Sequence, residues 1–313
     1  MKDRFNRNIE YLRISVTDLC NLRCKYCMPE KGVCKLHHED IISIEEIVEI
    51  VKIAAKNGIK KIRLTGGEPL VRRGFFTLCK EISQIENINE ICITTNGTYF
   101  YPLAEELFKV KVSRVNFSLD TLNAQKYKEI TRGGDIQKVL KSIKKAIEIG
   151  FKVKINIVLI GGFNDDEIID FVNLTKDNDI QVRFIELMQI GESASWSKEK
   201  FISNEVVLKK VEKFEKLKVD GVADTYRVPG YKGTFGLISP ISNCFCKTCN
   251  RIRLTSDGKL KPCLHSKAEI NLRGLKGKVL ERVFTESIFQ KPQSHHLEKG
   301  KSESLRDMNK IGG

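Results

Sequence analysis

Residues 11–27 read YLRISVTDLCNLRCKYC, a short alternating run followed closely by three cysteines. The segment Tyr11–Val16 predicts a β-strand, because apolar and polar side chains alternate along it. Similar short runs recur five times before residue 190, which predicts strands over Lys60–Thr65, Glu90–Thr94, Val112–Leu119, Lys152–Leu159 and Gln181–Leu187. The cysteines therefore stand at the carboxyl end of the first of six predicted strands.

Helical patterns with recognisable start and stop signals separate these strands. Ser43 and Glu46 form a capping box, a glycine marks a helix end, and an asparagine can cap a helix start. The helices predicted in this way are Ile44–Lys56 before Gly58, Asp135–Ile149 before Gly150, and Asp165–Lys176 after Asn164.

Strands that alternate with helices lie parallel and are joined by right-handed crossovers. Six repeats form either a doubly wound sheet or an incomplete TIM-type (β/α)6 barrel. In both folds ligands bind at the carboxyl ends of the strands. The sequence places its motifs at these ends: Cys20–Cys27, Gly66–Pro69, Asn96-Gly97, Ser118 and Asp120.

The regular alternation ends near residue 195, so we predict a barrel domain over 1–195 and a C-terminal region over 196–313. The tail beyond Pro292 is polar and is expected to be loose. The elements predicted in the C-terminal region are a helix over Asn204–Lys216, a hairpin of Arg251–Thr255 and Lys259–Leu264 turning at Asp257-Gly258, and a helix over Leu275–Phe289.

The composition is that of a folded, basic protein. Apolar residues make up 41% of the 313 positions, and no run approaches the roughly 18 apolar residues of a membrane span. The polar start Met1–Phe5 is unlike a secretory signal, so we expect a cytoplasmic protein with no membrane contact. Lysine and arginine exceed aspartate and glutamate by 14, which favours an anionic partner unless the lysines form an ordinary solvated surface.

Ten cysteines in a reducing compartment indicate metal ligands rather than disulfides. Cys20, Cys24 and Cys27 have the spacing C-x3-C-x2-C. Three such thiolates can hold one face of a cubane iron–sulfur cluster, which normally has four cysteine ligands, and so leave one iron open. Zinc competes with this interpretation, but a structural zinc site needs four ligands, and His37 and His38 lie awkwardly far along the chain.

Cys246, Cys249 and Cys263 form a second group of three. With Cys244 as a fourth thiolate they resemble a zinc site. However, a single residue separates Cys244 from Cys246, which is cramped for two ligands on one ion, and three cysteines again leave an iron open for substrate. Cys34, Cys79 and Cys92 stand alone, and the last two are interpreted as buried core residues.

The first cysteine group, with Tyr26 before its last cysteine, resembles the signature of the radical S-adenosylmethionine superfamily. Gly66-Gly67-Glu68-Pro69 is similar to the superfamily's GGEP loop, whose backbone lies toward the methionine amino group. The resemblance implies a [4Fe–4S] cluster whose open iron chelates S-adenosylmethionine. Reductive cleavage of that cofactor would release a deoxyadenosyl radical.

Further segments resemble the GTP 3′,8-cyclase family of molybdenum cofactor biosynthesis over nearly the whole chain. The matching stretches are Tyr11–Asp18, Lys61–Arg63, Arg183–Met188, Cys249–Thr255, Asp257–Lys259, Cys263-Leu264 and Gly312-Gly313. This resemblance implies conversion of GTP to 3′,8-cyclo-7,8-dihydroguanosine triphosphate. It also implies that the second cysteine group holds a second [4Fe–4S] cluster, in the C-terminal extension of a partial barrel, whose open iron binds guanine.

Site residues follow from the same resemblance. Arg251 and Arg253 alternate on a strand and project from one face, as suits binding of a triphosphate and a base. Together with the C-terminal Gly312 and Gly313, which would enter the active site, they are expected to be catalytic. The expected GTP contacts are Arg13, Arg63, Thr94, Lys154, Arg251 and Arg253, and the expected S-adenosylmethionine contacts are Tyr26, Gly67, Ser118 and Met188. Arg306 and Lys310 are expected to attract the tail toward phosphate or carboxylate.

The expected partners are GTP, a flavodoxin or ferredoxin as electron donor, and the next pathway enzyme, cyclic pyranopterin monophosphate synthase. A homodimer is compatible with the sequence, and neither nucleic acid nor a membrane is expected as a partner. Two other functions compete with this one. A radical S-adenosylmethionine peptide maturase would also carry auxiliary clusters, and a zinc-bearing nucleic-acid-binding protein would use the net charge.

Overall fold

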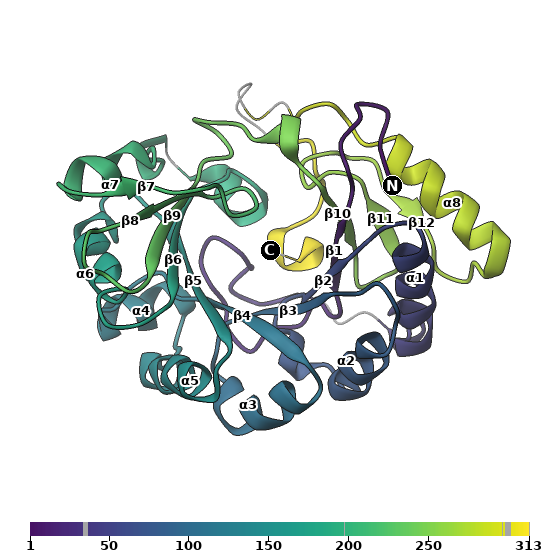
Figure 1. Ribbon diagram of the computed structural model, residues 1–313, viewed down its shortest axis with the longest axis horizontal. Coiled ribbons are helices and arrows are strands. Elements are labelled where there is room, and N and C mark those ends of the chain that lie inside the picture. Colours follow the sequence, from purple (N-terminus) through teal and green to yellow (C-terminus); the bar gives the residue numbers. More distant parts are fainter. Residues whose placement is uncertain (34–36, 197, 296, 298–301, 313) are drawn as a thin grey trace.

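The computed structural model describes residues 1–33, 37–196, 198–295, 297 and 302–312. Six parallel strands follow one another around a partial barrel in sequence order (Figure 1). They are β1 (Tyr11–Ser15), β2 (Lys61–Thr65), β3 (Glu90–Thr95), β4 (Val112–Ser118), β5 (Lys152–Leu159) and β6 (Gln181–Glu186). All six predicted strands are confirmed to within one residue at each end.

Helices cover the outside of the barrel (Figure 1). They are α1 (Ile44–Lys56), α2 (Phe75–Ser83), α3 (Phe100–Lys109), α4 (Ala124–Thr131), α5 (Ile136–Ile149) and α6 (Ile168–Asn173). The predicted capping box is present at the start of α1. Ser43 Oγ accepts from Glu46 N at 3.1 Å, and the Glu46 carboxylate accepts from Ser43 N at 3.0 Å. Within the described residues, no helix is both long and apolar enough to cross a membrane.

The C-terminal third extends the sheet at both edges. Strand β9 (Thr234–Ile238) pairs parallel with β6, and β10 (Arg251–Leu254) pairs parallel with β1. Antiparallel strands continue outward on each side: β8 (Asp224–Arg227) and β7 (Glu215–Lys216) beyond β9, and β11 (Lys259–Lys261) and β12 (Ile270–Asn271) beyond β10. The incomplete barrel with a C-terminal extension is thus confirmed, and the predicted hairpin is β10–β11. The boundary at residue 195 stays a prediction, since one sheet runs through both parts.

The described part of the C-terminal region also contains the helices α7 (Glu205–Lys210), α8 (Gly277–Phe289) and α9 (Met308–Ile311). Single 3-10 turns lie at His38–Asp40, Pro69–Val71, Asp165–Glu167, Gly191–Ser195, Lys198–Lys200 and Cys246–Thr248.

Strand side chains divide the molecule into a dry outer layer and a polar interior. Leu12, Ile14, Ile62 and Leu64 are fully buried in the hydrophobic core that includes the residues of the surrounding helices. The alternate positions, such as Arg13 on β1, belong to the opposite face of the sheet and line the barrel. Strands of a closed parallel core are usually apolar on both faces, so a polar inner face indicates a ligand cavity.

Two predictions about the C-terminal region are wrong. Helix α7 ends at Lys210 rather than Lys216, because Phe214 leaves the helical path to pack against Tyr226 and Phe235, with ring centroids 5.3 and 6.3 Å away. The tail is not loose over its last described residues: α9 lies inside the ring of strands (Figure 1), and Ile311 is fully buried.

Asn164 was predicted to cap a helix, and this is also wrong. Its side chain makes no capping bond, and the regular helix α6 starts only at Ile168. Instead Asn164 Nδ2 donates to the carbonyls of Asp120 at 2.7 Å and Val158 at 2.9 Å, and Oδ1 accepts from Ile160 N at 2.8 Å. The side chain thus ties the carboxyl ends of β4 and β5 together.

We predict that Asn164→Ala lowers the free energy of unfolding of the apoprotein by about 2–4 kcal/mol, because it leaves buried backbone groups without partners. Urea denaturation followed by circular dichroism measures this. The exposed Asn8→Ala is the control, with an expected change below about 0.5 kcal/mol. Equal effects of the two substitutions would show that Asn164 does not join the strands.

Candidate active site

The first cysteine group lies on the loop that follows β1. Backbone bonds fasten this loop to the end of α4, from Arg23 N to Thr131 O at 3.1 Å and from Lys25 N to Ile130 O at 2.9 Å. The Arg132 guanidinium also donates to the carbonyls of Arg23 and Met28. The loop is therefore held at the rim of the barrel before any cofactor binds.

The Gly66–Pro69 turn lies directly against this loop. Gly67 N donates to Thr17 O and Glu68 N to Leu19 O, both at 2.8 Å. A Cβ on Gly66 would meet Thr17 O at 2.3 Å, and one on Gly67 would meet Leu19 O at 2.2 Å. Only glycine allows the two backbones to approach this closely.

Glu68 fixes the same turn to β3. Its carboxylate accepts from Thr95 Oγ1 at 2.8 Å and from Asn96 N at 2.7 Å, and it is fully buried. Burial raises the pKa of Glu68 to about 7. The GGEP-like turn thus supports the site structurally, and the Glu68 carboxylate is occupied by hydrogen bonds within the protein.

The chemistry of the first three thiols fits an iron–sulfur cluster. Burial and mutual repulsion raise the pKa of Cys24 well above its usual range and that of Cys27 to about 12, so a bound cation is needed to keep them as thiolates. Around one tetrahedral zinc ion the sulfurs would lie about 3.8 Å apart. Among the described residues, Cys20, Cys24 and Cys27 are not a set whose ligand atoms all lie within 4.8 Å of one another, so they do not converge on one zinc ion as placed.

Tyr26 and Asp120 join the cysteine loop to the end of β4. The Tyr26 hydroxyl donates to Asp120 Oδ2 at 2.7 Å, and Val158 N donates to Oδ1 at 2.8 Å. Burial raises the pKa of Asp120 to about 6. Gly67, Ser118 and Met188 follow or end β2, β4 and β6, so the residues expected to contact S-adenosylmethionine share one rim.

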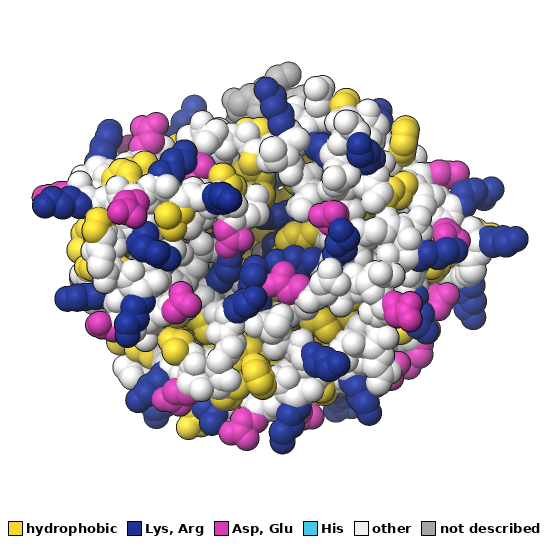
Figure 2. All heavy atoms as spheres, viewed as in Figure 1, with side chains coloured by type: hydrophobic (Ala, Val, Ile, Leu, Met, Phe, Trp, Pro, Cys, Tyr) yellow, Lys and Arg dark blue, Asp and Glu magenta, His cyan; other side chains and the backbone are white. Residues whose placement is uncertain are grey.

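Three arginines stand side by side on the inner face of the barrel. Strand register pairs Arg253 of β10 with Arg13 of β1, and Arg13 with Arg63 of β2. Burial and the charge of Arg253 lower the pKa of Arg13 well below its usual value. We call Arg13, Arg63 and Arg253 the arginine row. Figure 2 shows a hollow at the centre of this face of the molecule with Lys and Arg side chains in it.

Tyr11 lies one layer below the row, paired in register with Arg251. Its hydroxyl accepts from Arg63 Nε, and Arg63 Nη1 donates to Thr94 Oγ1 at 3.1 Å. Burial would raise the pKa of Tyr11, but the charges of Arg63 and Arg13 lower it to about 8. The expected GTP contacts on β1, β2, β3 and β10 are therefore neighbours.

Lys154 belongs to a second cationic group across the barrel, which also contains Arg183. Both donate to the Asp220 carboxylate, Arg183 at 2.8 Å. Burial and the charge of Arg183 lower the pKa of Lys154 to about 7, and these two cations hold the pKa of Asp220 well below its usual range. The sequence analysis missed the roles of Arg183 and Asp220, although the Lys154–Gln181 and Asn156–Arg183 strand pairings place Arg183 beside Lys154.

Several buried polar atoms on the inner face have no hydrogen-bond partner within the described part of the chain. They are Asn116 Oδ1, Asn156 Oδ1 and Arg251 Nε. A buried polar atom without a partner costs free energy, so these atoms indicate a ligand that completes their bonding.

The C-terminal tail reaches the arginine row. Gly312 O accepts from Arg253 Nη1 and from Arg13 Nη2, the latter at 3.4 Å. Gly312 has φ +74°, and a Cβ there would meet Thr65 Cγ2 at 2.5 Å. Gly313 lies outside the described residues. The structure thus places Gly312 where the sequence analysis expected it, inside the site.

Arg306 holds this tail by pairing with two carboxylates. Its guanidinium pairs with Asp257 at 2.8 Å and with Glu269 at 2.7 Å. Burial alone would lower the pKa of Arg306, but the two carboxylates raise it above its usual value. The Lys310 ammonium lies 3.5 Å from Asp307. Arg306 is thus attracted to carboxylates, as one of the two expected alternatives had it, and it anchors the tail on the β10–β12 extension.

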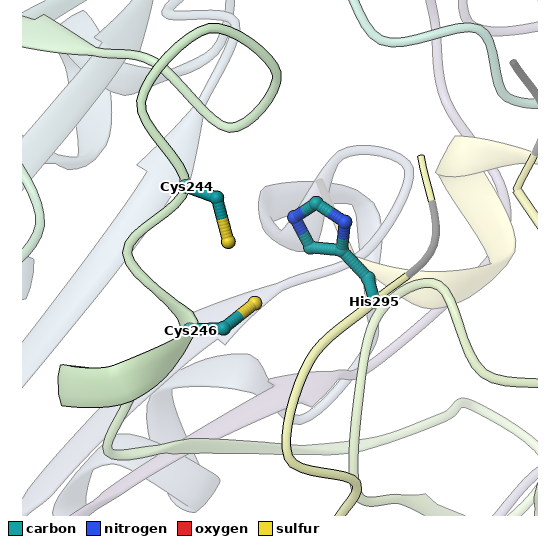
Figure 3. A group of neighbouring side chains, drawn as sticks. All are labelled: Cys244, Cys246 and His295. Carbon is teal, nitrogen blue, oxygen red and sulfur yellow. The ribbon is translucent and has the colours of Figure 1, made fainter. Parts of the chain in front are cut away.

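The second cysteine group surrounds β10 and β11. Cys246 opens a 3-10 turn, Cys249 precedes β10 and Cys263 follows β11. Burial and the neighbouring Cys244 and Cys263 raise the pKa of Cys246 to about 12. Among the described residues, the set of three possible metal ligands with all ligand atoms within 4.8 Å of one another is instead Cys244, Cys246 and His295 (Figure 3). Sequence analysis did not consider His295.

We predict that Arg306→Gln speeds hydrogen exchange of the backbone amides of residues 307–312 by about 10-fold or more, because Asp257 and Glu269 lose their shared partner. Hydrogen exchange followed by mass spectrometry measures this. Lys310→Gln removes the same charge from a half-buried position outside the Asp257–Glu269 anchor and is the control, with unchanged exchange. Unchanged exchange in Arg306→Gln would show that the tail is held by other contacts.

Solved structures with low sequence identity share the fold. The crystal structure of Streptococcus suis SuiB has a TM-score of 0.63 at 17% identity, covering 94% of this chain and 68% of that one. Native anSMEcpe with bound AdoMet has a TM-score of 0.56 at 18% identity, covering 86% and 80%.

Family models cover most of the chain. A model of the radical SAM superfamily matches residues 14–175, and one described as Molybdenum Cofactor Synthesis C matches residues 180–297. Proteins named GTP 3′,8-cyclase are 53% identical in Alkaliphilus metalliredigens, over 100% of both chains, and 54% identical in Peptoclostridium acidaminophilum, over 99% of this chain and 98% of that one. Full-length similarity at this level, together with the two cysteine groups and the arginine row, places the chain in the GTP 3′,8-cyclase family of the radical S-adenosylmethionine superfamily.

Proposed function

We propose that the protein is a radical S-adenosylmethionine GTP 3′,8-cyclase, a lyase that converts GTP to 3′,8-cyclo-7,8-dihydroguanosine triphosphate for molybdenum cofactor biosynthesis. The arginine row is the observation that carries this proposal. Three guanidinium groups on adjacent strands repel one another in a buried layer, and a triphosphate offsets that repulsion with bidentate hydrogen bonds. The cysteine loop and the GGEP-like turn open into the same barrel.

Each cysteine group has a proposed role. Membership of the superfamily implies S-adenosylmethionine and one [4Fe–4S] cluster, which we assign to Cys20, Cys24 and Cys27. We assign a second [4Fe–4S] cluster to Cys246, Cys249 and Cys263. When bound, the first cluster and S-adenosylmethionine supply the one-electron chemistry that starts the reaction.

The chain's own residues bind and orient the reactants. For GTP we propose Arg13, Arg63, Thr94, Lys154, Arg251 and Arg253, with Arg251, Arg253, Gly312 and Gly313 acting at the reacting nucleotide. For S-adenosylmethionine we propose Tyr26, Gly67, Ser118 and Met188. Gly312 already contacts two members of the arginine row, which supports a role of the tail in shaping the site and excluding water.

We propose that Asp220 takes the place of a phosphate group beside Lys154 and Arg183. Its carboxylate offsets Lys154 and Arg183, the cations that an incoming triphosphate would otherwise meet unpaired. Because the Asp220 side chain is 42% exposed, its carboxylate can rotate toward solvent when GTP binds.

The remaining expectations continue as proposals. They are residues 1–195 as a catalytic barrel with residues 196–313 as its auxiliary-cluster region, a flavodoxin or ferredoxin as electron donor, transfer of the product to cyclic pyranopterin monophosphate synthase, and a homodimer. The two family-model ranges, which meet near residue 180, support the division of the chain.

The decisive experiment compares deoxyadenosine formation by the anaerobically reconstituted, reduced protein with GTP, with ATP and without nucleotide. We expect strong stimulation by GTP alone, with GTP consumed in step. Slow cleavage of S-adenosylmethionine at a rate independent of the nucleotide would overturn GTP as substrate and favour a peptide substrate. Tightly bound zinc with salt-sensitive RNA binding, and no cleavage, would favour a nucleic-acid-binding protein.

Replacing single cysteines separates the two clusters. We predict that Cys24→Ala lowers deoxyadenosine formation by at least about 100-fold, because the open iron that binds the cofactor is lost. Cys263→Ala should retain some cleavage but form no cyclised nucleotide. Liquid chromatography of both products measures this. If Cys244→Ala behaved like Cys263→Ala, the ligand set of the second cluster would be wrong.

We predict that Asp220→Asn tightens GTP binding by roughly 5-fold, about 1 kcal/mol, since a competing carboxylate is removed. Anaerobic calorimetry of the reconstituted, unreduced protein measures the Kd without turnover. Asp224→Asn, which changes the same charge near exposed Lys216, is the control with unchanged Kd. Weaker binding by Asp220→Asn would show that the carboxylate assists GTP rather than competing with it.

A further inference from the structure

We infer that Cys244, Cys246 and His295 form a mononuclear zinc site, and that an ion bound there excludes the second iron–sulfur cluster. Two thiolates and an imidazole are a ligand set that zinc prefers, and a fourth position can be filled by water. Cys246 belongs to both sites, so one sulfur cannot serve both at once.

The ligand atoms already converge. One atom from each of the three residues lies within 4.8 Å of the others, and Figure 3 shows the two sulfurs and the imidazole ring turned toward one another. Tetrahedral zinc needs about 3.8 Å between sulfurs, so the site has to contract by at most about 1 Å. The short Cys244–Cys246 spacing, which the sequence analysis considered too cramped, therefore does not prevent both sulfurs from facing one ion.

A buried arginine holds the two ligand-bearing segments together. Arg7 pairs with Asp3 at 2.6 Å, and the same guanidinium donates to Cys246 O at 2.8 Å, Pro292 O at 2.7 Å and Gln293 O at 3.0 Å. It thus joins the backbone of Cys246 to the segment that leads into His295. This arrangement exists before any metal binds, which lowers the entropic cost of forming the site.

His295 is positioned further by its own neighbours. Its backbone N–H donates to the Cys246 sulfur, and its ring packs edge-on against His265 with centroids 4.8 Å apart. Nδ1 accepts from Leu297 N at 3.2 Å, so ligation by the other ring nitrogen would move the ring proton to Nδ1 and replace that bond, a local cost of binding.

The two cysteine ligands differ in solvent exposure, which suggests a route for entry of the ion. Cys244 is exposed, while Cys246 is only 9% exposed. An ion from solvent can therefore meet Cys244 first and pass to the buried sulfur, and binding releases the thiol protons. Cys249 and Cys263, the other proposed cluster ligands, are not part of the converging set.

The test is titration of the anaerobic apoprotein with Co²⁺, whose thiolate charge-transfer absorption reports sulfur ligands, followed by displacement with Zn²⁺. The full chain is used with Cys20, Cys24 and Cys27 replaced by alanine, so that the first group does not contribute, and the wild type is measured in parallel. We expect one ion per chain. Cys244→Ser and His295→Ala should weaken ion binding more than about 100-fold, whereas Cys249→Ser and Cys263→Ser should leave it nearly unchanged.

The site would be overturned if the protein bound no ion, or if Cys249→Ser and Cys263→Ser weakened ion binding while Cys244→Ser and His295→Ala did not. Exclusion is tested separately, because it rests on the second cluster proposed above, whereas the ion titration does not. Wild-type apoprotein preloaded with Zn²⁺ should incorporate less iron on reconstitution, by the iron of one cluster, and Cys244→Ser treated in the same way should incorporate the full amount. Full iron uptake with zinc retained in the wild type would show that the two sites coexist.

Discussion

Repulsion between Arg13, Arg63 and Arg253 is the constraint around which the interior of this barrel is organised. These side chains come from three neighbouring strands, and the strand register places them in one layer. Like charges in such a layer need partners that can also leave when an anionic ligand enters. The partners observed are modest ones: the Tyr11 hydroxyl, the Thr94 hydroxyl and backbone carbonyls. Opposite them, Asp220 supplies a full negative charge to Lys154 and Arg183.

The C-terminal extension also contributes residues to the interior of the barrel. Its strand β10 adds Arg251 and Arg253 to the barrel wall. The turn between them, and the segment before β12, supply the carboxylates of Asp257 and Glu269 that hold Arg306. That anchor leaves only a short span before Gly312, whose carbonyl meets Arg13 and Arg253. One region of the chain thus provides both the cations and the tail that covers them, and mutations in the anchor should affect the site without touching it.

Much of this could be predicted from sequence, because period-two alternation identifies strands and cysteine spacing identifies metal ligands. The six strands, the hairpin and the capping box of α1 follow from such local patterns. Asn164 was assigned to a helix start because its type is common there, whereas its side chain bonds the carbonyl of Asp120 after β4 and that of Val158 in β5. Asp220 and His295 were missed for a related reason. Asp220 meets Lys154 across 66 residues of sequence, and only tertiary packing brings His295 to Cys246. No local sequence pattern predicts either of these two contacts.

The pairing of β1 with β10 has a consequence for how the protein is made. Tyr11 lies beside Arg251 in the finished sheet, yet the ribosome produces these residues far apart in time. Until β10 is made, β1 keeps one open edge, and the barrel at whose rim the cysteine loop lies lacks its β10 wall. Open strand edges recruit other chains, and accessible thiols react with oxidants. The nascent chain is therefore most in need of chaperones and reducing conditions in the interval before β10 emerges, and slowing translation in that interval should lower the yield of correctly folded protein.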